Sequence, residues 1–268
     1  MTTLNSYLTV ENNLTRWQTM TADNPTVALQ TQYYKANIGK VTSISQFLNN
    51  SRLYNYAMTA FGLGSEASYY KGLMQKVLEQ GVSSKSSLAN TLNDSRVFAF
   101  AKTFSFAASG AKTTQSSAVK TDVVNQYINQ SLDTTQGQQN PGVQLALYFQ
   151  QNASGITNAY DILANQNLLT VAQTALGISP YSSLEPIDLQ AQQISSKINF
   201  SDFKNPTKLN AFIEQFCAMY DANNFNASGS GSSSSSPPGN AILASATGSA
   251  GFSTSLLLSI QSLQPGGS

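Results

Sequence analysis

The chain has 268 residues, of which 41% are apolar and 10% are charged, and its formal net charge is +1. Globular chains usually carry about 25% charged residues, and here the few basic residues are scattered, which argues against a nucleic-acid partner, since that would need clustered Lys and Arg. With no His and one Cys, the chain has no Ser-His-Asp or Cys-His arrangement, no usual zinc or iron ligand set and no internal disulfide.

Residues 1–22 form the first predicted segment, which has neither the basic region nor the apolar run of a cleaved signal peptide. Tyr7, Val10, Leu14 and Trp17 lie 3, 4 and 3 residues apart, and this spacing predicts a short helix with one apolar seam. Two interpretations of the seam stay open. It docks onto the core of its own chain, or it pairs with the other end of the chain or with neighbouring subunits.

The following segments contain a stretch of sequence that occurs twice, which we call the repeated phrase. The first copy, SRLYNYAMTAFGLG, begins at Ser51, and the second, QNLLTVAQTALGIS, begins at Gln166. When Gly62 is placed on Gly177, 115 residues later, the apolar positions coincide, and an Asn-Pro pair stands upstream of each copy. Because chance does not readily produce a shared Gly, a shared Asn-Pro pair and a consistent offset, we predict an internal duplication of about 90 residues per copy.

Each copy is predicted to be helical. Leu53, Ala57 and Phe61 lie on one face of a helix, for which Ser51 is the expected N-cap. Gly62 and its counterpart are each followed by an apolar residue, as in helices that close with a left-handed glycine. Few runs alternate apolar and polar residues as strands do. The sequence therefore predicts an all-α fold with two similar multi-helix subdomains.

A helix is predicted to join the two copies, because Val119, Val123, Tyr127 and Ile128 recur at helical spacing. Further on, ASGSGSSSSSPPGN has the composition of a flexible linker. The predicted organisation is an N-terminal helical segment (1–22), a first helical repeat (23–112), a connecting helix (113–137), a second helical repeat (138–222), a Ser/Gly/Pro linker (223–250) and an apolar tail helix (251–268).

The predicted tail helix carries a seam like that of the N-terminal segment, with four apolar residues that lie 4, 4 and 3 positions apart. The same two interpretations apply to it. If the seams pair with each other or with neighbouring subunits, the interface residues are Tyr7, Val10, Leu14, Trp17, Phe252, Leu256, Ile260 and Leu263.

No motif supports a catalytic, cofactor-binding or metal site. The carboxylates are isolated along the sequence, and Asp94 and Asp161 stand where helices are expected to begin, so capping explains them. Two fragments, SGAKTT and NIGKVTS, lack the full phosphate-loop pattern. Cys217 lies among aromatic residues and is expected to be a buried, inert thiol. The longest apolar run, LLLSIQSL, is too short to span a bilayer. We expect a non-enzymatic protein without a cofactor or an integral membrane segment.

Several phrases of the sequence resemble one known family. They are LNSYLTVENNLTRWQTMTADNP, YYKANIGKVTSISQFLNNSRLYNYAMTAFGLG, KVLEQGVSSKSSLANTLND and LLLSIQSLQPGG, and the most specific marker is FLNNSRLYNYAMTAFGL. The resemblance covers nearly the whole chain. It is to an uncharacterised alphaproteobacterial family, catalogued as domain of unknown function twelve-seventeen, which has no established enzymatic activity. Its members are commonly encoded among genes for flagellar rod, hook and motor parts, so the resemblance implies a flagellar context.

The leading hypothesis is a non-enzymatic structural or assembly component of the bacterial flagellum, exported without a cleaved signal peptide. Its expected partners are other flagellar subunits or copies of itself in a homo-oligomer, since a low net charge offers little repulsion against self-association. The alternative is a cytoplasmic regulator or export chaperone that binds another flagellar protein through its helical grooves. An enzyme of unfamiliar type is a third hypothesis.

Overall fold

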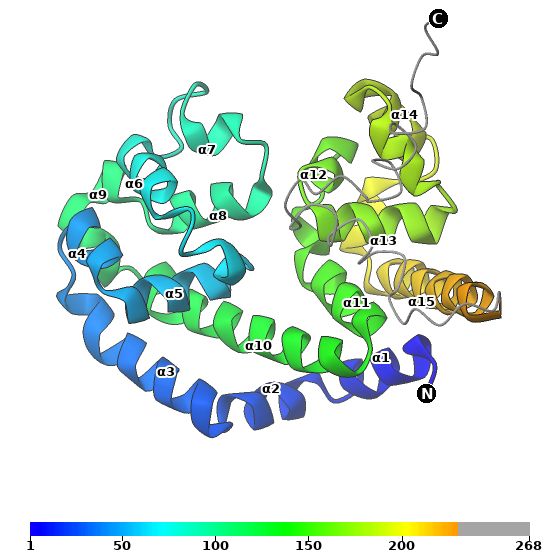
Figure 1. Cartoon of the computed structure of the whole chain (residues 1–268), viewed down its shortest axis with the longest axis horizontal. Helices are drawn as coiled ribbons and strands as arrows, with labels where there is room; N and C mark the ends of the chain where they lie inside the picture. Colours follow the sequence, from blue (N-terminus) through cyan, green and yellow to red (C-terminus); the bar gives the residue numbers. More distant parts are fainter. Residues whose placement is uncertain (230–268) are drawn as a thin grey trace, which may run out of the picture. The chain divides into compact units, whose positions relative to one another are not determined.

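The computed structural model describes residues 1–229, with side chains described up to residue 224. Met1–Asp221 form one compact unit, and the described part of the second unit, which begins at Ala222, is the end of the last helix. All regular elements in the described residues are helical (Figure 1). The predicted all-α class is confirmed.

Short turns separate the helices, several of them single turns of 3-10 helix such as η2 (Gly64–Glu66) and η6 (Pro180–Leu184). The last helix runs to Gly229 and so includes the start of the predicted linker, while the rest of that linker and the predicted tail lie outside the described residues. The α-helices are α1 (Thr3–Glu11), α2 (Leu14–Ala22), α3 (Pro25–Asn37), α4 (Ile44–Asn49), α5 (Ser51–Ala60), α6 (Lys71–Gln80), α7 (Leu88–Thr91), α8 (Ser95–Thr103), α9 (Phe106–Ser109), α10 (Val123–Gln139), α11 (Pro141–Asn152), α12 (Ala159–Leu163), α13 (Gln166–Leu176), α14 (Ile187–Ser195) and α15 (Pro206–Gly229).

Two hydrophobic cores organise the Met1–Asp221 unit. The first core is enclosed by α3 to α9 and the start of α10, and aromatic rings fill its centre, where the ring centroids of Phe47 and Phe104 lie 4.8 Å apart. The second core is enclosed by α11 to α15 together with α1 and the end of α10. We call residues 23–112 the first lobe and residues 138–221 the second lobe.

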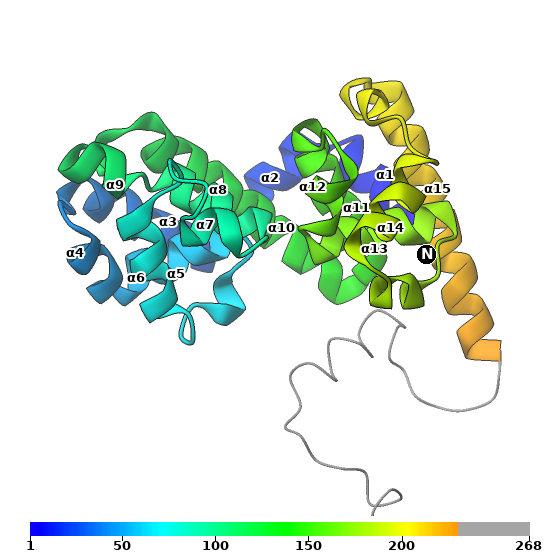
Figure 2. The same cartoon turned by 90° about the horizontal axis from the view of Figure 1, so that it is seen from above.

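Helix α10 contributes side chains to both cores. Val123 and Val124, near its start, are buried in the first core, and Leu132, further along, is buried in the second. The helix packs against α5 of the first lobe and against α11 of the second. In Figure 2, the visible part of α10 lies between the two groups of helices. Because one continuous helix is fixed in both cores, it couples the packing of the two lobes.

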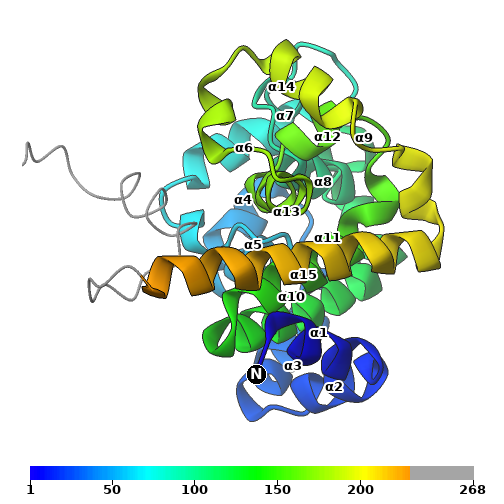
Figure 3. The ribbon, with the colours of Figure 1, turned by 90° about the vertical axis from the view of Figure 1, so that its right-hand side faces the viewer.

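The N-terminal helix α1 is fastened to the second lobe. The backbone N–H of Thr3 donates to both carboxylate oxygens of Asp221, at 3.1 and 2.9 Å, and the Thr3 hydroxyl donates to Oδ1 of the same carboxylate at 2.6 Å. This negative charge satisfies the free Thr3 N–H at the start of α1 and matches the helix dipole of α1. Figure 3 shows α15 running past α1. A contact between residues 218 positions apart in sequence thus joins the two ends of the Met1–Asp221 unit.

The repeated phrase begins each time with an asparagine cap. The Asn50 side chain accepts a hydrogen bond from the N–H of Leu53 at 3.2 Å, and the Asn165 side chain accepts from the N–H of Leu168 at 3.3 Å. The expected cap at Ser51 is therefore wrong by one position, because Asn50 already satisfies the free N–H and Ser51 is the first helical residue.

Each copy of the phrase also ends in the same way. Gly62 and Gly177 have φ angles of 70° and 62°, in the left-handed region that favours glycine. The residue after each glycine turns back onto the helix, with Leu63 N–H donating to Met58 O at 2.8 Å and Ile178 N–H donating to Gln173 O at 2.9 Å. The predicted helix stops are confirmed, and they share one hydrogen-bond pattern.

Candidate interaction surface

The second lobe exposes a group of large apolar side chains. Tyr181 is 80% exposed and Leu184 is 86% exposed, while Tyr160, Ile187 and Leu189 are about half exposed. All lie on α12, η6 or the start of α14, and α12 packs directly against α14. We call these five residues the apolar surface of the second lobe. Apolar groups gathered on one surface often mark a place where another molecule binds.

Local structure holds the large side chains of η6 outward. Gln173 on α13 is buried and donates to the hydroxyl of Ser182 at 3.2 Å and to that of Ser183 at 3.1 Å. The small Ser182 is therefore buried, while Tyr181 and Leu184 on either side of it point to solvent. Here a small polar residue is buried and large apolar residues are exposed, which is the reverse of the usual distribution.

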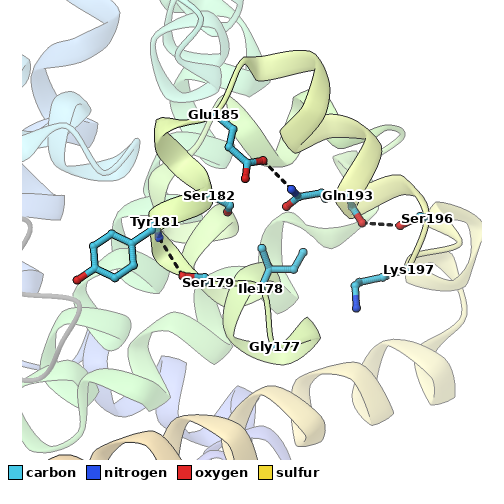
Figure 4. A pocket seen from close by; sticks show the side chains of 9 residues that line it. All are labelled: Gly177, Ile178, Ser179, Tyr181, Ser182, Glu185, Gln193, Ser196 and Lys197. Atoms are coloured by element: carbon cyan, nitrogen blue, oxygen red, sulfur yellow. Dashed lines mark hydrogen bonds between the residues drawn. The ribbon is translucent and has the colours of Figure 1, made fainter.

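A shallow hollow of about 510 Å³ adjoins this surface and is bordered by the turn at Gly177 (Figure 4). Its lining includes Ile178 and carries two ionisable side chains, Glu185 and Lys197, on different sides. Glu185 accepts a hydrogen bond from Gln193 at 2.6 Å, and the Tyr181 ring points away from the hollow in Figure 4. A mixed, open hollow of this kind suits the edge of a protein contact better than a site that encloses a small ligand.

The rim of the apolar surface is acidic. Glu185 and Asp188 are exposed, and Asp188 accepts a hydrogen bond from the Tyr160 hydroxyl at 2.9 Å. Residues 138–196 contain three acidic residues and no Lys or Arg, and the exposed Lys197 lies on a different side of the hollow from Glu185. The surface therefore offers a partner apolar contact bordered by negative charge.

Comparisons with known proteins place the chain in a family. A family model described as a protein of unknown function (DUF1217) matches residues 60–209, more than half of the chain. The chain belongs to this family.

A solved structure agrees with the family assignment. The crystal structure of protein AGR_C_984 from Agrobacterium tumefaciens is similar to this chain, with 36% sequence identity and a TM-score of 0.78 over 83% of this chain and 94% of the other. Among curated proteins, none matches the chain. The apolar surface lies within the residues that the DUF1217 model matches.

The predicted interface residues of the N-terminal seam lie against their own chain. Tyr7 and Val10 are fully buried in the second core, so they are not available to another molecule, and this part of the interface prediction is corrected. Leu14 and Trp17 are half buried and pack against the same core. The physical reason is the anchoring of α1 by Asp221, which holds the seam on the second lobe. The four residues of the tail seam, Phe252, Leu256, Ile260 and Leu263, lie outside the described residues.

The isolated acids behave mostly as expected. Asp94 accepts a hydrogen bond from the N–H of Arg96 at 2.8 Å and caps α8, and Asp161 forms a capping box with Asn158 at the start of α12. Cys217 is buried, and burial raises the pKa of its thiol to about 12, as suits an inert core residue. Within the described residues, no cluster of three His, Cys, Asp or Glu is placed to hold a metal ion. No helix of this part of the chain combines the length and the hydropathy needed to cross a bilayer.

Asp133 is a buried acid that sequence reasoning missed. It lies on α10 in the interior of the unit, fully shielded from solvent. Its Oδ1 accepts a hydrogen bond from Gln151 at 2.9 Å, while Oδ2 has no hydrogen-bond partner. Burial raises the pKa of this carboxyl to about 8, because the charged form loses its hydration. Its neighbour Leu132 is part of the core, but nothing in the local sequence marks an acid on the buried face of α10.

Proposed function

We propose that the chain is a non-enzymatic structural or assembly protein that acts through protein–protein contacts made by the apolar surface of the second lobe. The observation that carries the proposal is the exposure of Tyr181 and Leu184 beside Ile187 and Leu189. The proposed association with the flagellum and export without a cleaved signal peptide rest on the family resemblance of the sequence.

Burial of these side chains against a partner would supply the binding free energy. Each large apolar side chain that moves from water into a packed contact contributes about 1.5–3 kcal/mol. A central group of such anchors with a polar rim is the usual form of a protein interface. Here Leu184 and Tyr181 are the anchors, and Glu185 and Asp188 form the rim.

Complementation of a deletion strain tests the proposal. In the bacterium that encodes this chain, we expect deletion of the gene to reduce the number of flagella per cell and the swimming-halo diameter. The double substitution Leu184→Ser with Ile187→Ser should fail to restore either, because it removes two exposed apolar contacts. Leu29→Ser, at an exposed apolar position on α3 of the first lobe, is the matched control and should restore both.

Immunoblots of each strain confirm that the variants accumulate to the level of the original protein. Full restoration by the double variant would contradict a role for the apolar surface, and a deletion strain with normal flagella would contradict the flagellar role. Fractionation of the cells tests location. Recovery in the sheared flagellar fraction supports the structural role, whereas recovery only in the cytosol supports the alternative of a cytoplasmic regulator or export chaperone.

A further inference from the structure

The charges of the chain are divided unevenly between the two lobes. The first lobe, residues 23–112, contains nine basic and four acidic residues. In contrast, the second lobe, residues 138–221, contains six acidic and three basic residues, and the acidic residues at its apolar surface are Glu185 and Asp188. The near-zero net charge of the whole chain therefore conceals a positive first lobe and a negative apolar surface on the second.

The positive charge of the first lobe is largely uncompensated. In residues 1–229, the salt bridges of the first lobe join Arg96 to Glu66 and to Asp94. The other eight basic residues of this lobe are exposed. Three of them bond to neutral amides: Arg52 donates to the Gln30 side chain at 3.2 Å, Lys71 to that of Asn49 at 3.5 Å and Lys40 to that of Asn37 at 3.3 Å. Their charge remains available to an acidic partner.

Arg52 and Lys71 occupy positions that the local structure disfavours. Arg52 lies in the first turn of α5 and Lys71 is the first residue of α6. The N-terminal end of a helix carries partial positive charge, so a cation there is destabilising. Residues that oppose local preference in this way are expected where another role requires them.

Exposed aromatic side chains accompany these two cations. Tyr69 is 88% exposed and Tyr70 is also exposed, directly before Lys71 in the chain. Arg52 lies over the ring of Tyr33, with the guanidinium carbon 3.8 Å from the ring centroid.

Lys71 reaches Asn49, three residues before Arg52 in the chain, so the two cations lie on either side of the same turn. We call Arg52, Tyr69, Tyr70 and Lys71 the basic surface of the first lobe. It combines positive charge with aromatic contact area, the two properties that complement the apolar surface of the second lobe.

We infer that the apolar surface of the second lobe binds the basic surface of the first lobe in a second copy of this chain. The inference deepens the proposed function and rests on it. Glu185 and Asp188 of one copy face Arg52 and Lys71 of the next, and Leu184 packs against the exposed tyrosines. Two acidic surfaces placed against each other would bring like charges together, which disfavours a symmetric pairing of the second lobes.

Because two different surfaces meet, a pair of copies keeps one free apolar surface and one free basic surface and can add another copy at either end. Such a heterologous contact generates a closed ring or an open filament, depending on the rotation between neighbours. Both surfaces are exposed within one copy, so they are not satisfied by each other in the same chain.

Sedimentation of the purified full-length protein tests this inference. At about 50 mM salt we expect oligomers whose size grows with protein concentration, and at about 500 mM salt the association constant should fall at least about tenfold, because salt screens the charges. A protein that stays monomeric at about 100 µM and low salt overturns the inference.

Charge reversal then identifies the two surfaces. One variant carries Glu185→Lys with Asp188→Lys, and the other carries Arg52→Glu with Lys71→Glu. Each alone should be monomeric, since like charges now meet at the contact, while an equimolar mixture should associate through the surfaces that remain complementary. A chain with all four substitutions should associate again. Circular dichroism and urea unfolding confirm that each variant is folded.

A matched control carries Lys35→Glu with Lys102→Glu, which changes the same net charge of the first lobe at exposed positions outside the basic surface. It should associate like the original protein. Association of the Arg52→Glu and Lys71→Glu variant alone, or of both reversed variants alone, overturns the inference because other surfaces then suffice. A monomeric protein whose Leu184→Ser and Ile187→Ser variant still fails in complementation leaves the proposed function standing with a different partner.

Discussion

Helices α6 and α14 have the same place in the order of elements of the two lobes, but they are packed against different neighbours. Each follows a helix of the repeated phrase and a 3-10 turn. In the first lobe α6 packs against α4, α7 and α9, and Met74, Val77 and Leu78 are buried. In the second lobe α14 packs against α12, α13 and η6 and buries Ala191 and Ile194.

The segment after each helix explains the difference. After α6, the chain supplies α7, α8 and α9 before it reaches α10, and α7 and α9 cover the apolar face of α6. After α14, a single 3-10 turn, η7 (Phe200–Lys204), leads to α15. In the first lobe, the later helices α7 and α9 thus cover the apolar face of α6. In the second lobe, no such helices follow α14 before α15 begins, and Ile187 and Leu189 stay exposed. A similar run of helices can serve as a closed core or as a binding surface, depending on which later segment covers it.

The largest expected effect is a loss of stability when a buried side chain of α6 is shortened, compared with an exposed side chain of α14. Met74→Ala should lower the free energy of unfolding by about 2–5 kcal/mol, because Met74 is fully buried and the substitution leaves a cavity. Leu189→Ala on α14 should change it by less than about 0.5 kcal/mol, because Leu189 is half exposed. Urea unfolding followed by circular dichroism measures both. Equal losses for the two variants would show that the surface of α14 is covered in solution.

The next effect is a pH dependence of stability caused by Asp133, which is the one buried carboxyl in residues 1–224. Burial raises its pKa to about 8 in the folded chain, whereas the unfolded chain has an ordinary Asp pKa near ~4. Between these values the folded state holds a proton that the unfolded state has released. The free energy of unfolding therefore falls as the pH rises through this window, and the destabilisation is complete above about pH 8.

Asp133→Asn should remove this pH dependence and raise the free energy of unfolding by roughly 2–4 kcal/mol at pH 8, with little effect near pH 4. The amide keeps an oxygen that accepts the hydrogen bond from Gln151. Urea unfolding at several pH values between these limits measures the effect. Asp188→Asn, at an exposed carboxyl of the second lobe, is the control and should leave the pH profile unchanged. A pH profile that persists in the Asp133 variant would contradict the assignment.

The smallest expected effect tests what the two lobes share. Gly62→Ala and Gly177→Ala should each lower the free energy of unfolding by about 1–2 kcal/mol, because both glycines have left-handed backbone. A Cβ at Gly177 would meet nothing within 4 Å, and at Gly62 it would meet only ordinary contacts, so backbone strain decides both. Gly155→Ala, in open space without a positive φ, is the control. A loss at only one of the two glycines would show that the matching helix ends are not equivalent in energy.

Several local features could be predicted because they depend on neighbouring residues. The glycine stops after α5 and α13 and the capping roles of Asp94 and Asp161 follow from side chains a few positions apart. The error at Ser51 has the same scale, since Asn50 beside it is the better-placed cap. The origin of the two copies in a duplication stays a prediction, which the shared order of elements supports.

The interaction surface could not be predicted in the same way. The spacing of apolar residues predicts only that Tyr7 lies on an apolar seam, and no pattern distinguishes Tyr181, yet Tyr7 is fully buried and Tyr181 is 80% exposed. The difference arises from contacts between distant segments. Asp221 fixes α1 on the second lobe, and no described segment covers η6 as α7 and α9 cover α6.

The sequence by itself determined the all-α class and the helix stops, because helical period, capping and turn residues act within a few positions of each other. It also determined family membership, which follows from the likeness of whole stretches of sequence. Only the tertiary structure decided which apolar faces are buried, that the carboxyl of Asp133 lies in the interior, and that the second lobe keeps an open surface. Burial depends on which elements meet in space, and here the decisive pairs, such as Thr3 with Asp221, are separated by most of the chain.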